Sequence, residues 1–340
     1  MIILKDIPVW ENVDYDCFHN EIVPLNQPAV IKSLVSDWPL VKAANKSSSS
    51  AVDYLKPFDN QANISALVGA PDINGRFFYN DNLTELNFKR AKVTLSIGLD
   101  RLLAIKNNSK PHTVTLQTTQ LSDVMPDFQP LHHQPLLKKN INTNMWIGNR
   151  AVVAPHYDIN DNLACVAAGS RKFTLFSPDQ INNLYPGPIL STPAGVPISL
   201  VDIRDPDLKR FPKYIKALDA GFEATLDAGD ALFVPALWWR GIESLDSFNI
   251  LLNYIWKNEN KQTISPQDSL LHSMLSISNL NEAKRDAWQQ IFEYYVFKTK
   301  DEAANHLPHN LKDITTGLNA TEEADVRKFL ADMLVQIDLN

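Results

Sequence analysis

The chain has 340 residues, a length that suits either two domains or one large domain. Lys and Arg total 32 against 39 Asp and Glu, so the net charge is −7 and a general nucleic-acid-binding protein, which needs a basic surface, is not expected. Two cysteines, Cys17 and Cys165, are too few for a disulfide framework or a thiolate zinc site. No stretch reaches the roughly 18 apolar residues of a membrane span, and no signal-peptide pattern is present. We therefore expect a cytoplasmic protein that binds neither nucleic acid nor a membrane.

Residues 1–110 mix short strand-like and helix-like runs, which we interpret as an α/β flanking region. β-branched and aromatic residues predict strands over residues 28–32 and 76–79. Four serines, Ser47 to Ser50, precede an apolar run at residues 51–55. Ser50 is therefore expected to cap a short helix, which Pro57 ends.

Residues 111–262 have a different sequence pattern, in which short β-rich runs alternate with turn residues. The clearest runs are residues 113–117, 144–153, 163–168, 172–176, 231–235 and 248–256. Many short strands of this kind favour a sandwich or a barrel.

Residues 263–340 are predicted to be helical. Ser265 followed by Pro266 is typical of a helix start. Apolar side chains then recur at helical spacing, in two groups: Trp288, Ile291, Phe292 and Tyr295, and Val326, Phe329, Leu330, Met333, Leu334 and Ile337. These stripes either pack onto the β-rich part or form a homodimer interface.

A His-x-Asp motif, His156 and Asp158, follows the apolar run at residues 151–155. At the end of a strand the two side chains share one face, because side chains alternate with a period of two. An imidazole and a carboxylate placed in this way are two thirds of the facial triad that holds non-haem iron. The motif alone is weak evidence, since it is common by chance.

The segments around this motif add specificity. They are residues 149–158 (NRAVVAPHYD), 169–180 (GSRKFTLFSPDQ), 184–186 (LYP), 229–239 (GDALFVPALWW), 27–32 (QPAVIK) and 37–39 (DWP). Together they resemble the JmjC-domain, or cupin-like, Fe(II)- and 2-oxoglutarate-dependent oxygenases, above all the asparaginyl hydroxylases and bacterial cupin-like members. The resemblance implies a double-stranded β-helix core, mainly β with α, and a C-terminal helical region that forms a homodimer.

The resemblance also implies a site and an activity. Its residues are His156 and Asp158 as metal ligands, with Asn162, Asn253, Arg171, Thr115 and Arg240 around the cofactor. Arg171 stands where the hydroxylases have a Lys that pairs with the distal carboxylate of 2-oxoglutarate, and an Arg fork can bind a carboxylate. Thr115 stands where they have a Tyr. The implied activity is hydroxylation of a protein or peptide, with Fe(II) and 2-oxoglutarate as cofactors and a peptide or small molecule as substrate.

The largest departure from the family pattern is the third metal ligand. After Trp238 and Trp239 the family has a His, and this chain has Arg240. A guanidinium has no lone pair to give to a metal, because it does not deprotonate in proteins. The usual triad therefore cannot form from these positions.

Three interpretations of Arg240 follow. In the first, Arg240 fills the metal's space and pairs with Asp158, which makes the chain a pseudo-oxygenase that binds a peptide, glycan or metabolite. In the second, Glu243, His132 or His133 completes a metal site. In the third, an anionic small molecule or a peptide carboxylate binds Arg240 together with the arginine of the cosubstrate site.

Overall fold

The computed structural model describes residues 4–118, 120–138, 141–256, 265–297, 306 and 320–337. The chain divides into two compact units, Met1–Asn260 and Lys261–Asn340. The first unit holds all the described strands, and the second holds the last three α-helices of the described residues. The predicted three-part division at residues 110 and 262 stays a prediction. Strands from both sides of residue 110 share the same sheets.

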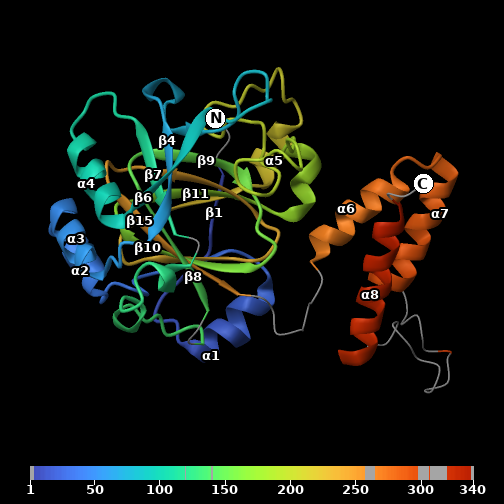
Figure 1. The fold of residues 1–340 in the computed structure, drawn as a ribbon, viewed down its shortest axis with the longest axis horizontal. Helices are drawn as coiled ribbons and strands as arrows, with labels where there is room; N and C mark the ends of the chain where they lie inside the picture. The colour runs from blue at the N-terminus through green and yellow to red at the C-terminus, as the bar shows by residue number, and fades with distance from the viewer. Residues whose placement is uncertain are drawn as a thin grey trace. The chain divides into compact units, whose positions relative to one another are not determined.

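Two sheets build the first unit (Figure 1). The six-stranded sheet has the order β1 (Lys5–Asp6), β12 (Phe222–Leu226), β11 (Arg171–Phe176), β14 (Trp239–Ser244), β9 (Ala151–His156) and β5 (Arg76–Phe77). The nine-stranded sheet has the order β2 (Val9–Trp10), β3 (Ala29–Ile31), β13 (Ala231–Val234), β10 (Asp161–Ala168), β15 (Asn249–Trp256), β8 (Asn142–Gly148), β7 (Thr113–Gln117), β4 (Asn63–Gly69) and β6 (Phe88–Thr94).

The eight strands from β8 to β15 confirm the predicted jelly-roll core. In one sheet β8, β15, β10 and β13 are neighbours, and in the other β9, β14, β11 and β12. Consecutive strands of the chain thus alternate between the sheets for most of their course, and each neighbouring pair of these strands is antiparallel. This is the double wrapping of a jelly roll, which hides most strand edges.

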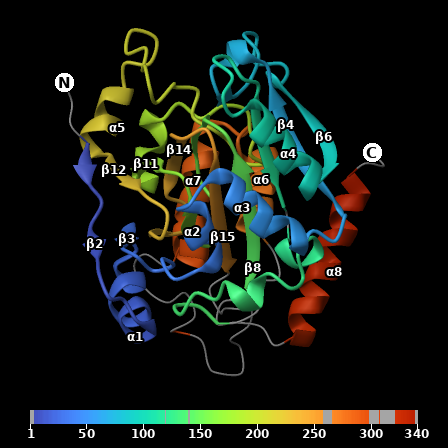
Figure 2. The same cartoon turned by 90° about the vertical axis from the view of Figure 1, so that its left-hand side faces the viewer.

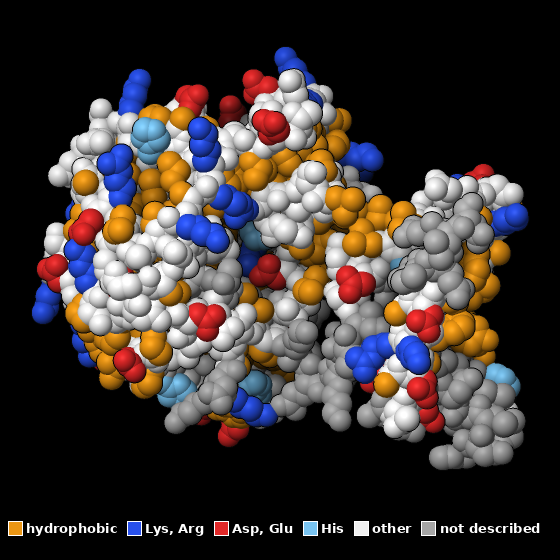
Figure 3. Space-filling model, viewed as in Figure 1, with side chains coloured by type: hydrophobic (Ala, Val, Ile, Leu, Met, Phe, Trp, Pro, Cys, Tyr) orange, Lys and Arg blue, Asp and Glu red, His pale blue; other side chains and the backbone are white. Residues whose placement is uncertain are grey.

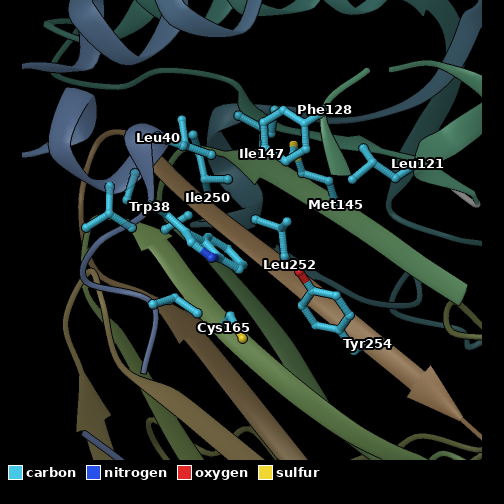
Figure 4. Packing of buried hydrophobic residues seen from close by; sticks show 14 of the residues in the cluster. Trp38, Leu40, Leu121, Phe128, Met145, Ile147, Cys165, Ile250, Leu252 and Tyr254 are labelled. Carbon is cyan, nitrogen blue, oxygen red and sulfur yellow. The ribbon is translucent and has the colours of Figure 1, made fainter. Parts of the chain in front are cut away.

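Helices cover the outer face of the nine-stranded sheet. Figures 1 and 2 show α2 (Pro39–Ala44), α3 (Ser48–Leu55) and α4 (Leu95–Ile105) on this side. Their apolar side chains join the largest buried cluster with outward-facing residues of the strands, such as Met145, Cys165 and Leu252. Figure 4 shows this packing around Trp38 and Tyr254. The outer face of the nine-stranded sheet is therefore covered by a packed core. A second buried cluster fills part of the space between the sheets, and a cavity occupies another part.

The remaining described helices of the first unit are short. The remaining α-helices are α1 (Tyr15–Cys17) and α5 (Tyr214–Ala220), and the other helical segments are 3-10 or π-helical turns. Tyr214 of α5 is fully buried and packs with Phe176 and Trp239 on the outer side of the six-stranded sheet.

Two local predictions were wrong. The run 144–153 is not one strand, because Asn149 and Arg150 form a turn between β8 and β9. The cap of α3 is Ser47, not Ser50: the Ser47 hydroxyl accepts a hydrogen bond from the backbone N–H of Ser50 at 3.0 Å. The helix therefore begins three residues earlier than expected, with the serines forming its first turn.

The second unit contains α6 (Pro266–Ile277), α7 (Glu282–Phe292), a π-helical turn at Glu293–Phe297 and α8 (Ala320–Ile337). The predicted start of α6 is confirmed, since the Ser265 hydroxyl accepts from the backbone N–H of Gln267 and Pro266 is the first helical residue. The side chains of Leu334 and Ile337 lie outside the described residues. Within the described helices no membrane-crossing candidate is found, because none is both long and apolar enough.

Candidate functional site

A cavity of about 380 Å³ lies between the two sheets of the first unit. Six of the seven predicted site residues line it: Thr115, His156, Asp158, Arg171, Arg240 and Asn253. Asn162 does not line the cavity, but its amide donates a hydrogen bond to Asp158 Oδ2 at 3.3 Å. The structure thus brings the whole predicted set together, and a volume of this size suits a small molecule.

One end of the cavity holds the His-x-Asp motif. His156 is the last residue of β9 and lies beside Arg240 of β14 in the strand register. Asp158 lies just beyond the strand, where its backbone carbonyl accepts from the N–H of Leu237 at 2.8 Å. The Arg240 guanidinium forms an ion pair with Asp158 Oδ2. Arg240 therefore occupies the position next to both members of the motif.

Burial and charge set the protonation of this pair. Burial lowers the pKa of His156, and the nearby charge of Arg240 lowers it further. His156 Nδ1 donates to the carbonyl of Ala154 at 2.9 Å, so a neutral ring presents the Nε2 lone pair. Burial pushes the pKa of Asp158 upward, but Arg240, His156 and Asn162 outweigh it and hold that pKa below its usual value. The end of the cavity thus contains a carboxylate, a guanidinium and a neutral imidazole.

The other end of the cavity is formed by Arg171. It lies on β11 opposite Ser244 of β14. Arg240 lies four residues away along β14, opposite Leu175 of β11. The Arg171 side chain is buried, with an exposed fraction of 6%. Within the described residues it has no hydrogen bond or ion pair, and its Nε is fully buried without a partner. Burial lowers its pKa to about 9. An unpaired buried guanidinium is costly, so this end is built to receive an anion.

Sequence reasoning missed several residues of the cavity. Asn144 lies opposite Asn253 in the register of β8 and β15, and the Oδ1 atoms of both amides are buried without a partner. Trp146 and Gln117 line the middle, and Arg90 lines the wall near β6. The alternation of side chains along β8 could have identified some of them, because Asn144, Trp146 and Gly148 all face the cavity.

The cavity is positively charged, although the chain as a whole is acidic. The charged side chains that line it are Arg90, Arg171 and Arg240 against Asp158 alone. Arg90 and its neighbours Lys89 and Lys92 are exposed on β6, and Figure 3 shows Lys and Arg side chains gathered on this face of the first unit. Electrostatics therefore favours anionic ligands in the cavity.

The alternative metal ligands considered from the sequence lie elsewhere. On β14, Arg240, Ile242 and Ser244 line the cavity, so Glu243 points to the opposite face of the sheet. His132 stacks on Phe128 at 3.6 Å between ring centroids, and neither it nor His133 lines the cavity. The hypothesis that one of these three residues completes the triad is therefore wrong.

The residues present do not fit the iron centre of the oxygenases. The facial triad needs two imidazoles and a carboxylate, and among the described residues that line this cavity His156 is the only histidine and Asp158 the only acidic residue. The third position carries a guanidinium whose charge already neutralises Asp158. Among the residues that the structure describes, no group of three or more His, Cys, Asp or Glu side chains is placed to hold a metal.

Comparisons with known proteins agree with this fold. The family model described as a cupin-like domain matches residues 16–262. Among curated proteins, the chain is similar to JmjC domain-containing protein D of Dictyostelium discoideum, with 27% identity over 68% of this chain and 52% of that protein. It is similar to tRNA wybutosine-synthesizing protein 5 of Danio rerio, with 26% identity over 77% of this chain and 78% of that protein.

A third relative is the lysine-specific demethylase JMJ31 of Arabidopsis thaliana, with 26% identity over 71% of this chain and 48% of that protein. The chain thus spans about half the length of this demethylase and of the Dictyostelium protein. The names of these relatives describe different reactions on different substrates, so the similarity by itself selects none of them.

Proposed function

Because the chain belongs to the cupin-like domain family, we propose that it uses that family's cavity as a metal-free binding site for a small organic acid. The observation that supports this proposal is the ion pair between Arg240 and Asp158. It supplies a positive charge beside the carboxylate, where the oxygenases of the family have the metal ion. The protein is then a binding member of an oxygenase family, a pseudo-oxygenase.

Arg171 is the anchor of the organic acid in this proposal. It is buried and unpaired, and Ser244 lies opposite it in the β11–β14 register. Thr115 lines the same cavity, and neither hydroxyl has a side-chain hydrogen bond to another described residue. A carboxylate placed there receives a bidentate contact from the guanidinium and hydrogen bonds from the hydroxyls. The ligand's negative charge offsets the cost of burying Arg171.

Metal binding is the first test of the proposal. Mn(II) titrations of the wild type should show no tight site, and Arg240→His should raise the affinity at least tenfold, because it supplies the missing imidazole. Arg240→Met is the matched control, since it removes the charge without adding a nitrogen or oxygen ligand. Near-stoichiometric metal in the wild type, with succinate formed from 2-oxoglutarate, would overturn the proposal in favour of the oxygenase activity that the resemblance implies.

Ligand binding is the second test. Calorimetry with glutarate or 2-oxoglutarate should show binding to the wild type, and Arg171→Ala should weaken it by about 1.5–3 kcal/mol, or roughly 10- to 150-fold. Lys172→Ala is the control, because Lys172 is the next residue on β11 and pairs with Glu223 at 2.7 Å. Equal affinities of the Arg171→Ala variant and the wild type would remove Arg171 from the site.

A further inference from the structure

At the end of the cavity opposite Arg171, several hydrogen-bond acceptors have no donor partner among the described residues. Asp158 Oδ2 is taken by Arg240 and Asn162, but Asp158 Oδ1 has no hydrogen-bond partner among the described residues. His156 Nε2 has none either, because its hydrogen bond to Ala154 uses Nδ1. The Oδ1 atom of Asn253 is buried without a partner. The three residues that carry these acceptors line the same cavity.

Acceptors without a partner in residues that line a cavity predict a donor on the ligand. A buried polar atom without a hydrogen bond costs free energy, so native sites rarely leave several together. A keto group or a plain carboxylate offers no N–H to these atoms. An ammonium group offers three N–H donors and a positive charge, which matches a carboxylate, a neutral imidazole and an amide oxygen.

Arg240 supplies the complementary group at the same end. Its Nη2 pairs with Asp158, whereas its Nε is buried without a partner. A guanidinium has five N–H donors, so Arg240 can hold Asp158 and a ligand carboxylate at the same time. A ligand that carries a carboxylate and an ammonium group close together would then bind Arg240 through the first and the unpaired acceptors through the second.

We propose that the ligand is a free acidic α-amino acid of the glutamate type. Its α-ammonium group donates to Asp158 Oδ1, His156 Nε2 and the amide pair Asn144–Asn253, its α-carboxylate binds Arg240, and its side-chain carboxylate binds Arg171. This rests on the proposed metal-free binding function and names the ligand class.

The spacing of the two arginines suits such a ligand. Arg171 and Arg240 lie four residue steps apart along the β11–β14 pair. At about 3.3 Å per residue their backbones are about 13 Å apart, within the combined reach of two Arg side chains and a five-carbon acid. Between them the wall is apolar, with Val153, Ile242 and Leu251, which suits the methylene groups of the ligand.

Glutarate is the matched control ligand, because it has the two carboxylates and the five-carbon chain of glutamate without the amine. In calorimetry the wild type should bind L-glutamate at least tenfold more tightly than glutarate or 2-oxoglutarate, since only glutamate satisfies the acceptors. Asn253→Leu and Asn144→Leu should each weaken the binding of glutamate and leave that of glutarate unchanged. Two variants are used because Asn253 is 5% exposed whereas Asn144 is only half-buried, so folding is less sensitive to the second.

The outcomes separate this inference from the proposed function. Glutarate bound as tightly as glutamate, with Arg171→Ala weakening both, would overturn the amino-acid assignment and leave the organic-acid site standing. Loss of glutarate binding in the Asn144→Leu variant would likewise contradict a specific contact with the ammonium group. Failure of all three acids to bind the wild type would overturn both proposals.

Discussion

Arg240 and Asp158 depend on each other, because each would otherwise be a charge with little access to water. The Arg240 side chain is 7% exposed and that of Asp158 is 29% exposed. Arg240→Met should lower the free energy of unfolding by about 3 kcal/mol, the lower end for a broken buried pair, since Asp158 keeps some contact with solvent. Urea denaturation measures this. The double variant Arg240→Met with Asp158→Asn should lose less, and an equal loss would contradict the coupling.

His132 gives the fold a pH dependence that is separate from the cavity. It is 1% exposed and packed against Trp38, Tyr54 and Phe128, and burial lowers its pKa from 6.5 to about 4. The unfolded chain therefore binds more protons than the folded chain between these values, so stability falls as the pH drops through this window. From pH 7 to pH 5 the loss should be about 2 kcal/mol.

The matched variant for this prediction is His132→Gln, which has no titratable group. Urea denaturation of both proteins at the two pH values isolates the contribution of His132, because every other group titrates in both. An unchanged difference between wild type and variant at pH 7 and pH 5 would show that His132 does not carry the effect.

The positions of the site residues and the pairing of Arg240 with Asp158 could be predicted from the sequence, but the amide pair Asn144–Asn253 could not. His156, Asp158 and Arg171 lie in motifs that resemble the family, so the fold brings them to one cavity. Asn144 lies in no motif, and only the register of β8 against β15 places it opposite Asn253. That register depends on contacts between strands far apart in the chain, which local patterns do not encode.

At the scale of the elements, the first turn of α3 tests the corrected cap. Ser47→Ala should destabilise the protein by about 1 kcal/mol, because the N–H of Ser50 loses its acceptor. Ser49→Ala is the control, since Ser49 is exposed and has no side-chain hydrogen bond to another described residue. Thermal or urea denaturation of the two variants should rank Ser47→Ala as clearly the less stable. If Ser49→Ala were less stable than Ser47→Ala, Ser47 would not be the N-cap of α3.

The strands that were predicted and those that were missed differ in composition. β7 and β10 were found because they are continuous runs of β-forming residues. β6 was missed because Lys89, Arg90 and Lys92 hide its strand character. It is the last strand of the nine-stranded sheet, where charged residues discourage pairing with another chain. β14 was missed because Arg240 and Gly241 interrupt its apolar run.

At the scale of the molecule, the second unit has an apolar surface that its own described helices do not cover. Neither α6 nor α7 buries a residue. The exposed large apolar side chains of this unit include Leu275, Trp288, Ile291, Phe297, Phe329, Leu330 and Met333. Short helices gain most of their stability from packing, so we expect a binding partner to bury the exposed apolar side chains of this unit. A second copy of the chain is the partner that the family resemblance predicts.

The homodimer remains a prediction with a direct test. Light scattering should give the mass of a dimer, and Leu330→Asp should give a monomer, because a charge would be buried at the interface without a partner. Lys328→Asp, also on α8 and exposed, is the control that changes charge outside the apolar stripe. A monomer mass for the wild type over a wide concentration range would contradict the dimer.

Residues 5–10 border both sheets at once. β1 runs parallel to β12 at the end of the six-stranded sheet, and β2 runs parallel to β3 at the end of the nine-stranded sheet. Ile7 between them is 2% exposed and packs in the cluster between the sheets. During synthesis β1 is made well before its partner strand β12. β1 therefore cannot pair until β12 has been made, and until β1 pairs, that edge of β12 is open to pairing with other chains.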